Sequence, residues 1–223
     1  MRRLLIAAAL VTIVAPPLAA ALSTAQTRRI EDAAAVLTAI HAVPDRDIPQ
    51  ELWDKAACVM VVPGLKKAAF VFGGEYGKGL MSCRQNGGWS APIFMSLGKG
   101  SWGLQIGAQS IDLVLLVTSN NGVEKLLGNK VSLGAEISVA AGPVGRDARI
   151  ATDAAMQAEI FSYSRTQGLF AGINLSGGVI RGADDDNRDL YGGTVAPREV
   201  LLGGTVAGPA VTQPFMKALR RGM

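Results

Sequence analysis

The chain has 223 residues, of which 49% are hydrophobic and 18% are charged. This composition excludes an intrinsically disordered protein, and the length is sufficient for one domain with a substantial core. The formal net charge is +4, but the basic residues do not form the concentrated stripe that nucleic-acid binding needs, so we expect no nucleic-acid partner.

The beginning of the chain has the pattern of a secretory signal peptide, with two arginines followed by an apolar run over residues 4–14. Residues 19–21 (Ala-Ala-Ala) and 23–25 (Ser-Thr-Ala) are both candidate cleavage sites. The alternative is a membrane anchor, but the apolar run is shorter than the roughly 20 residues of a span, and a proline pair interrupts it. We therefore predict a signal peptide over residues 1–25 and a periplasmic or secreted mature protein.

The remainder, residues 26–223, is predicted to form a single domain that begins with helices. Residues 27–42 place apolar side chains at helical spacing, with Thr27 as the N-cap and Pro44 after the end. A second, short helix is expected to start at Pro49, because proline suits the first turn of a helix.

From residue 57 onward, short apolar runs alternate with turn residues, which is typical of β-strands. The expected strands cover residues 58–62, 68–72, 80–85, 89–97, 113–117, 131–140, 156–163, 169–175 and 179–180. Residues 73–79 are rich in glycine and are interpreted as a loop or a sharply bent strand, and Asn86-Gly87-Gly88 predicts a hairpin turn.

The central run 101–117 has two halves of different character. Its second half is an apolar run typical of a strand buried on both faces, and the glycines of its first half indicate a bend, a bulge or a close approach of the backbone. One or two helical turns are expected at 123–127, and a terminal helix at 211–221. The predicted fold class is α+β: a mainly antiparallel, strongly curved, barrel-like sheet with N-terminal helices and a short C-terminal helix.

The two cysteines, Cys58 and Cys83, lie in strands that we expect to be neighbours. An oxidising compartment favours a disulfide between them, and the closed loop of about 25 residues corresponds to roughly 3 kcal/mol in the loop-entropy description. The alternative is a pair of buried free thiols.

The sequence indicates no catalytic residues, no metal and no cofactor. His41 is the single histidine, and neither a catalytic triad nor a zinc site of standard spacing can be built around it. The glycine-rich stretch fails the P-loop pattern, because Phe72 stands in place of the first glycine and Gly79 in place of the hydroxyl residue.

Two alternative interpretations remain open, a cation site and a hydrolase activity. The acidic run from Asp184 to Asp189 is interpreted as a solvated polar loop, and a weak, irregular cation site is its alternative. An uncharacterised hydrolase would need polar groups such as Glu75, Arg84 and Asp112 to converge in a cleft. Each of these three also has an ordinary interpretation as a strand-end or surface residue.

Basic residues cluster at two positions, Lys66-Lys67 and the C-terminal group Lys217, Arg220 and Arg221. The second group accompanies apolar residues in the pattern of a short cationic amphipathic helix, which could rest on an anionic surface. The alternative is a docked terminal helix whose charges are solvated. Each cation near an anionic membrane contributes about 1 kcal/mol, so these five residues are the candidate lipid-binding residues.

Several separated segments resemble the SYLF family of lipid-binding domains. They are residues 61–68 (Val-Val-Pro-Gly-Leu-Lys-Lys-Ala), 73–77 (Gly-Gly-Glu-Tyr-Gly), 103–109 (Gly-Leu-Gln-Ile-Gly-Ala-Gln) and 168–172 (Gly-Leu-Phe-Ala-Gly), and the resemblance extends over about 30–192. It implies a phosphoinositide-binding type of module, with actin binding and bundling in yeast-type relatives. Lys66 and Lys67 match a basic position of the family. The leader sequence indicates a bacterial secreted member, which lacks an appended Src-homology or FYVE module.

Together these observations predict an exported, non-enzymatic domain that binds anionic phospholipid, a membrane surface or a related amphiphile at the cell envelope. The first alternative is a structural or protein-interaction module of the envelope, with an unknown protein partner. The hydrolase is the remaining alternative.

Overall fold

The computed structural model describes residues 22–42, 48–69, 72–85, 87–102, 107–128, 130–144, 157–166 and 169–221. Most of the expected signal peptide, residues 1–21, lies outside the described residues. The helices are α1 (Thr24–Ile40), α2 (Gln50–Lys55), α3 (Asn120–Leu126), α5 (Asp184–Tyr191), α6 (Pro197–Leu202) and α7 (Gln213–Arg220), preceded by the 3-10 turn η1 (Ala210–Thr212). The strands are β1 (Cys58–Ala69), β2 (Phe72–Gln85), β3 (Gly88–Trp89), β4 (Ile93–Trp102), β5 (Gly107–Val117), β6 (Val131–Ser132), β7 (Val139–Ala141), β8 (Ile160–Thr166), β9 (Leu169–Gly172) and β10 (Gly178–Gly182).

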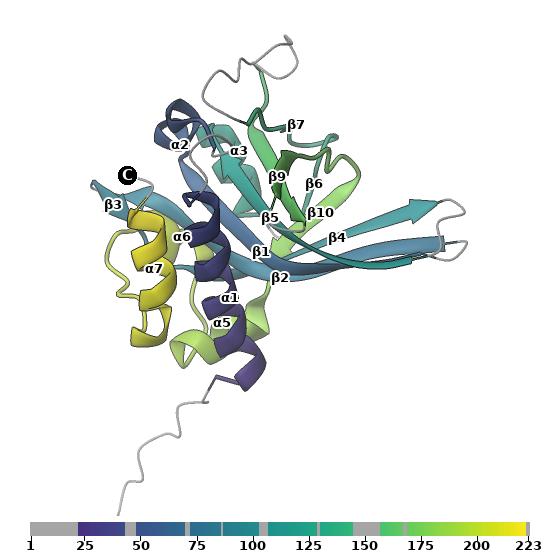
Figure 1. Cartoon of the computed structure of the whole chain (residues 1–223). Coiled ribbons are helices and arrows are strands. Elements are labelled where there is room, and N and C mark those ends of the chain that lie inside the picture. Colours follow the sequence, from purple (N-terminus) through teal and green to yellow (C-terminus); the bar gives the residue numbers. More distant parts are fainter. Residues whose placement is uncertain are drawn as a thin grey trace, which may run out of the picture.

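The strands form one curled sheet in the order β6-β10-β4-β2-β1-β5-β8-β7, with β3 paired to β2 and β9 to β8 (Figure 1). The described strand pairs are antiparallel except for β7 and β8, which run parallel. Helices α1 and α7 lie side by side over one face of the sheet (Figure 1). The predicted fold class, a curled and mainly antiparallel sheet with N-terminal helices and a C-terminal helix, is confirmed.

The central strands are apolar on both faces because each face carries its own core. In β1, Val59 and Val61 pack into the cluster that contains the buried side chains of α1 and α7. The alternate residues, Met60 and Val62, pack into a second cluster with buried residues of α3 and α6. A strand buried on both sides reads as a continuous apolar run, which explains residues 58–62 and 113–117.

Four strands continue beyond the helices as a projecting part of the sheet, which we call the arm (Figure 1). The arm consists of residues 65–69 of β1, 72–77 of β2, 98–102 of β4 and 107–111 of β5. Helices cover none of the arm in this view, and Lys66, Gly74 and Tyr76 are exposed on it, whereas Leu65 and Ile111 are buried.

A β-bulge at Gly64 marks the base of the arm. Val61 pairs with Leu80 and Lys66 pairs with Tyr76, so β1 holds one residue more than β2 between these two pairs. Gly64 has a φ of 58°, in the left-handed region that glycine adopts without strain. Because a bulge bends its strand and increases the local twist, this residue helps set the direction of the arm.

The first helix begins earlier than expected. α1 starts at Thr24, and its N-cap is Ser23 rather than Thr27. Ser23 and Gln26 form a capping box, in which each side chain satisfies the backbone N–H of the other. The expectation for Thr27 was wrong because this box already satisfies the N–H groups that a cap would serve.

Three further expectations about elements were wrong. The acidic run 184–189 is not a loop but part of α5, because aspartates are favourable at the positive N-terminal end of a helix. The expected strand 131–140 is divided into β6 and β7 around a turn at Gly134, whose φ is 85°. The expected strand 89–97 is divided into β3 and β4.

Other observed elements agree more closely with those expected from the sequence. The glycine-rich stretch 73–79 is a strand, as one of its two interpretations proposed. The hairpin at Asn86-Gly87-Gly88 is confirmed by the pairing of Arg84 with Trp89, although Asn86 itself lies outside the described residues. The run 101–117 is shared between β4 and β5, which β1 and β2 separate in the sheet, and residues 103–106 lie outside the described residues. Helix α6 had not been predicted.

Candidate functional site

The first pair of predicted lipid contacts, Lys66 and Lys67, lies in the arm. Lys66 is exposed, makes no ion pair with any described residue, and is the cross-strand neighbour of Tyr76. Tyr76 is 48% exposed, so about half of its aromatic side chain is available to the surroundings. Successive residues of a strand point to opposite faces, so Lys67 lies on the other face, where its Nζ is 3.2 Å from Oε1 of Glu75.

The second group of predicted lipid contacts lies on the terminal helix. Lys217, Arg220 and Arg221 are exposed, whereas the apolar side chains of α7 are buried against α1 and the sheet. The helix is therefore docked on the protein with its charges exposed, as the alternative interpretation described. The apolar residues of α7 belong to the core of the protein, so only its cations are available to a surface.

The structure does not bring these two groups of cations together. α7 packs on β3, which pairs with Arg84 and Gln85 of β2, whereas Lys66 pairs with Tyr76. The eight residues from Tyr76 to Arg84 correspond to roughly 26 Å along a strand. Lys66 and the cations of α7 thus lie near opposite ends of β2 and form two separate basic surfaces.

The three candidate hydrolase residues are also apart, and each has a structural partner. Glu75 pairs with Lys67 in the arm. Arg84 donates from Nε to the Ala56 carbonyl at 3.0 Å, and its guanidinium lies 4.6 Å from the centre of the Trp89 ring. The carboxylate of Asp112 accepts a hydrogen bond from the Gly64 N–H at 2.9 Å and pairs with Arg165 on β8. These groups do not converge on a common cleft.

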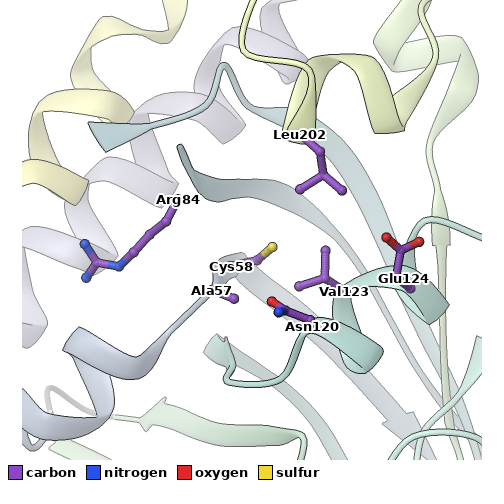
Figure 2. Close-up of a pocket in the computed structure, with 7 residues that line it drawn as sticks. All are labelled: Ala57, Cys58, Arg84, Asn120, Val123, Glu124 and Leu202. Carbon is purple, nitrogen blue, oxygen red and sulfur yellow. The ribbon is translucent and has the colours of Figure 1, made fainter. Parts of the chain in front are cut away.

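A cavity of about 430 Å³ opens between the start of β1, α3 and α6 (Figure 2). Its lining residues are Ala57, Cys58, Arg84, Asn120, Val123, Glu124 and Leu202. Figure 2 shows the Arg84 guanidinium turned away from the cavity, and the carboxylate of Glu124 is paired with Arg198. The two charged residues of the lining, Arg84 and Glu124, are therefore engaged with the protein, and the lining residues include no nucleophile next to a base.

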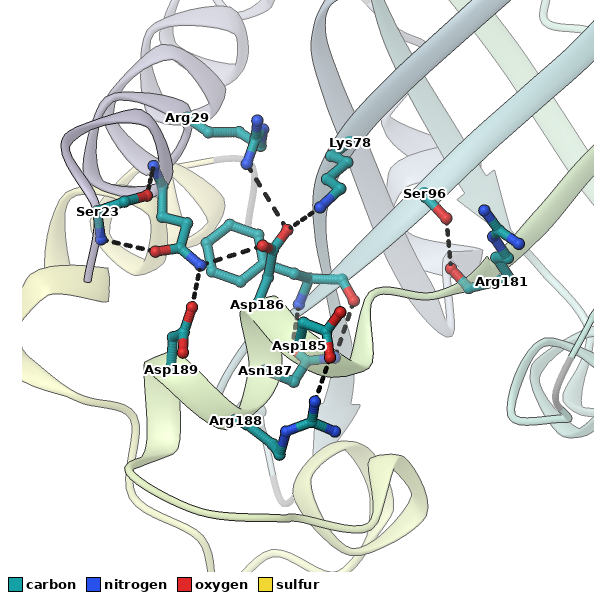
Figure 3. Close-up of polar contacts among 12 residues, drawn as sticks. Ser23, Arg29, Lys78, Ser96, Arg181, Asp185, Asp186, Asn187, Arg188 and Asp189 are labelled. Atoms are coloured by element: carbon teal, nitrogen blue, oxygen red, sulfur yellow. Dashed lines mark hydrogen bonds and ion pairs between the residues drawn. The ribbon is translucent and has the colours of Figure 1, made fainter. Parts of the chain in front are cut away.

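The acidic residues of α5 bind neighbouring side chains of the protein (Figure 3). Asp186 is buried, with its Oδ2 2.8 Å from Nζ of Lys78 and 3.8 Å from Nη1 of Arg29. Asn187 lies between the backbone groups of Phe94: its Oδ1 accepts from the Phe94 N–H, and its Nδ2 donates to the Phe94 carbonyl. The helix is therefore attached to β2 and β4 by its polar residues, which explains the acidic composition of this segment without a bound cation.

No group of three or more His, Cys, Asp or Glu residues within the described ranges is placed to hold a metal ion. In the same part of the chain, no helix combines the length and the apolar character needed to cross a bilayer. The predicted disulfide between Cys58 and Cys83 is present, and both cysteines are fully buried.

Sequence reasoning missed Tyr76 as a surface feature. Part of the signal was available in the sequence, because Tyr76 is an aromatic residue in a glycine-rich segment that was interpreted as a loop or a bent strand. Only the register shows that Tyr76 and Lys66 are neighbours, because the bulge at Gly64 shifts β1 by one residue.

Comparison with known proteins identifies the family. Residues 98–222, more than half of the chain, match the family Ysc84, described as Las17-binding protein actin regulator. The chain is 40% identical over 165 residues to an SH3 domain-containing protein of Schizosaccharomyces pombe, and the match covers 72% of this chain and 38% of that protein. It is 31% identical over 179 residues to LAS seventeen-binding protein 3 of Saccharomyces cerevisiae, with 78% and 39% covered.

A human relative shows the same pattern. SH3 domain-containing YSC84-like protein 1 of Homo sapiens is 30% identical over 164 residues, which cover 73% of this chain and 48% of that protein. The chain thus spans less than half the length of these three relatives. The description of the family refers to binding and to actin regulation, and the name of the Saccharomyces cerevisiae relative refers to binding. The resemblance found in the sequence is confirmed, and the chain belongs to the Ysc84/SYLF family.

Proposed function

We propose that this chain is an exported, non-enzymatic domain that binds anionic lipid, or a related amphiphile, at the cell envelope through its arm. One observation carries the proposal: Lys66 and Tyr76 are exposed cross-strand neighbours on a part of the sheet that projects beyond the helices. The charge of Lys66 is not neutralised by an ion pair with any described residue, so it is available to an anionic headgroup.

The chemistry of this pair suits a membrane interface. Tyrosine combines an apolar ring with a polar hydroxyl and is enriched at the level of the lipid headgroups. A lysine can lay its aliphatic stem on apolar surface while its ammonium stays among the headgroups, where it contributes about 1 kcal/mol. In the sequence, the five residues that follow Lys67, Ala68-Ala69-Phe70-Val71-Phe72, are all apolar and uncharged, as expected for a segment that meets lipid.

The cations of α7 define a competing lipid surface. Lys217, Arg220 and Arg221 could attract the same membrane electrostatically, but their helix has no apolar residue left to insert. Binding through α7 should therefore be purely electrostatic and disappear at high salt, whereas binding through the arm should retain an apolar component.

Sedimentation with vesicles tests the proposal and separates the two surfaces. The vesicles contain phosphatidylglycerol or cardiolipin, with phosphatidylcholine vesicles as the neutral reference. We expect Lys66→Gln to weaken binding about fivefold, from roughly 1 kcal/mol per cation, and Tyr76→Ser to weaken it further. Matched controls are Lys130→Gln, an exposed lysine outside the arm, and Leu169→Ser, which is 54% exposed on β9.

The outcomes are distinct. If binding is lost only in the triple variant Lys217→Gln, Arg220→Gln and Arg221→Gln, the protein binds lipid through α7 and not through the arm. Absence of binding to both anionic vesicle types at low salt would contradict the lipid function itself.

A protein-interaction module is the second candidate function, and the comparisons favour it specifically. The matched family is described as Las17-binding and as an actin regulator. Sedimentation with filamentous actin, run beside the vesicle assay with the same variants, is the test. Binding to actin filaments without binding to anionic vesicles would support this second candidate.

A further inference from the structure

The lysines of the arm lie at one level along it. Lys67 of β1 pairs in register with Glu75 of β2, and Glu75 pairs with Lys99 of β4. Lys66 precedes Lys67 in the same strand and pairs with Tyr76. These residues therefore occupy a single step of each strand, and we call the side chains of Lys66, Lys67, Glu75, Tyr76 and Lys99 the girdle.

The described positions of the arm beyond the girdle carry no charge. They are residues 68–69 of β1, 72–74 of β2, 100–102 of β4 and 107–108 of β5. They include Phe72 and Trp102, which pair in register. From Tyr76 to Phe72 the strand covers roughly 13 Å. Cations and a tyrosine below an uncharged end are typical of an element that enters a lipid interface from that end.

The girdle leaves a positive charge on each face of the arm. On the face of Tyr76, Lys66 is exposed and makes no ion pair with any described residue. On the other face, Lys67 and Lys99 flank Glu75, whose Oε1 lies 3.2 Å from Nζ of Lys67. One carboxylate neutralises only one of these two lysines. An anionic surface therefore has to meet both faces of the arm to use the whole charge of the girdle.

The helices obstruct a flat surface that approaches the face of Tyr76. Lys78 follows Tyr76 on this face, roughly 7 Å along the strand, and its Nζ is 2.8 Å from Oδ2 of Asp186 on α5. A helix is about 10 Å across, so α5 would meet a flat surface before Tyr76 does. The arm points away from the helices (Figure 1), so approach along its long axis is unobstructed.

The edges of the arm limit how far it can enter a bilayer. Among the described strands, residues 100–102 of β4 and 107–108 of β5 have a paired strand on one side only. Unpaired backbone groups are costly in the hydrocarbon core, whereas water still reaches them in the headgroup layer. Insertion of the arm should therefore stop at the boundary between the headgroups and the acyl chains.

We infer that the arm meets an anionic bilayer end-on, with its uncharged end at this boundary and the girdle among the outer headgroup atoms. The inference rests on the proposed lipid function and deepens it. Lys99, on the face opposite Lys66, becomes a contact residue, and Trp102 becomes part of the inserted end.

Sedimentation with phosphatidylglycerol vesicles at low salt tests the part of Lys99. Lys66→Gln and Lys99→Gln should each weaken binding about fivefold, and the double variant roughly 25-fold. Lys130→Gln, which removes an exposed lysine outside the arm, should bind like the wild type. Weakening by Lys66→Gln but not by Lys99→Gln would overturn end-on binding and leave the lipid function intact. Absence of binding by the wild type would contradict the lipid function and the inference together.

Tryptophan fluorescence tests insertion, which a purely electrostatic contact would not produce. Phosphatidylglycerol brominated near the start of its acyl chains should quench Trp102. Trp53 and Trp89 are at most 9% exposed and should keep their emission. Trp102→Phe should therefore abolish the quenching. No quenching of the sedimenting wild type, or equal quenching in Trp102→Phe, would overturn the end-on arrangement.

Discussion

The carbonyl oxygen of Val61 occupies the space that a Cβ on Gly79 would need. This contact lies where the bulge in β1 around Gly64 begins, beside the neighbouring strand β2. The extra residue in β1 pushes the backbone of that strand toward β2, and glycine at position 79 leaves room for it. The direction of the arm therefore depends on this close approach as well as on the left-handed conformation of Gly64.

A methyl group at position 79 should be poorly tolerated for this reason. We expect Gly79→Ala to lower the free energy of unfolding by roughly 3 kcal/mol, as overpacking against backbone does. Urea unfolding followed by circular dichroism measures the change. The matched control is Gly100→Ala, since Gly100 lies in the arm with no atom within 4 Å of an added Cβ. The control should be neutral or up to about 1 kcal/mol more stable, and equal losses in both variants would contradict the bulge argument.

Asp112 should stabilise the bulge through a hydrogen bond more than through its charge. Asp112→Ala leaves the Gly64 N–H without its 2.9 Å acceptor and is expected to cost about 2 kcal/mol. Asp112→Asn keeps an acceptor oxygen and loses only the half-exposed ion pair with Arg165, so its cost should stay below about 1 kcal/mol. Equal destabilisation of the two variants in urea unfolding would instead assign the effect to the charge.

The disulfide should be protected from reductants in the native protein, and breaking it should lower the stability of the protein. Cys58 and Cys83 are both 0% exposed, so a reductant should reach them only through unfolding. After reduction and alkylation in denaturant, the free energy of unfolding should be about 3 kcal/mol lower than for the oxidised protein. Mass spectrometry of alkylated samples checks the first part, and rapid alkylation without denaturant would show that the bridge is accessible in the folded state.

Glu159 should make stability depend on pH in the acidic range. Burial acts to raise the pKa of Glu159, but hydrogen bonds from the Ser138 backbone N–H, the Asn121 amide and the Lys125 ammonium outweigh it and hold the pKa below its ordinary value of 4.5. A carboxylate whose pKa is lowered by folding stabilises the protein above its unfolded-state pKa, and the contribution is lost as the pH falls through the native pKa.

The corresponding experiment compares the wild-type protein with Glu159→Gln between pH 7 and pH 3. The wild type should be the more stable near neutrality, and the difference should shrink below about pH 4.5, the ordinary pKa of glutamate. Glu31→Gln, on the exposed side of α1, is the control for removal of a surface carboxylate. A difference that does not change with pH would show that the loss comes from packing rather than from the charge.

Much of the strand content could be predicted from the sequence because it follows from local chemistry. The apolar runs 58–62 and 113–117 predicted strands, the second of them buried on both faces, and the two lie side by side in β1 and β5. The cysteine pair predicted a bridge between neighbouring strands, and Cys58 is paired with Cys83 in register. The amphipathic pattern of the last helix predicted α7.

The character of the candidate site depended on long-range contacts that no local pattern contains. The acidic run 184–189 has the composition of a solvated loop, and the approach of Lys78, Arg29 and Gln26 makes a buried aspartate at 186 favourable. The five predicted cations look equivalent in the sequence, yet Lys67 is neutralised by Glu75 whereas Lys66 is not.

The sequence by itself predicted the central strands, the disulfide and the family, because hydrophobic periodicity, cysteine content and separated motifs are properties of the residues themselves. The tertiary structure decided which polar groups are free and which are paired. It placed Lys66 beside Tyr76 on the arm and kept them far from α7, because one extra residue at Gly64 shifts the register of β1. A one-residue shift sends each side chain of a strand to the opposite face, and this geometry is set only when the neighbouring strands have assembled.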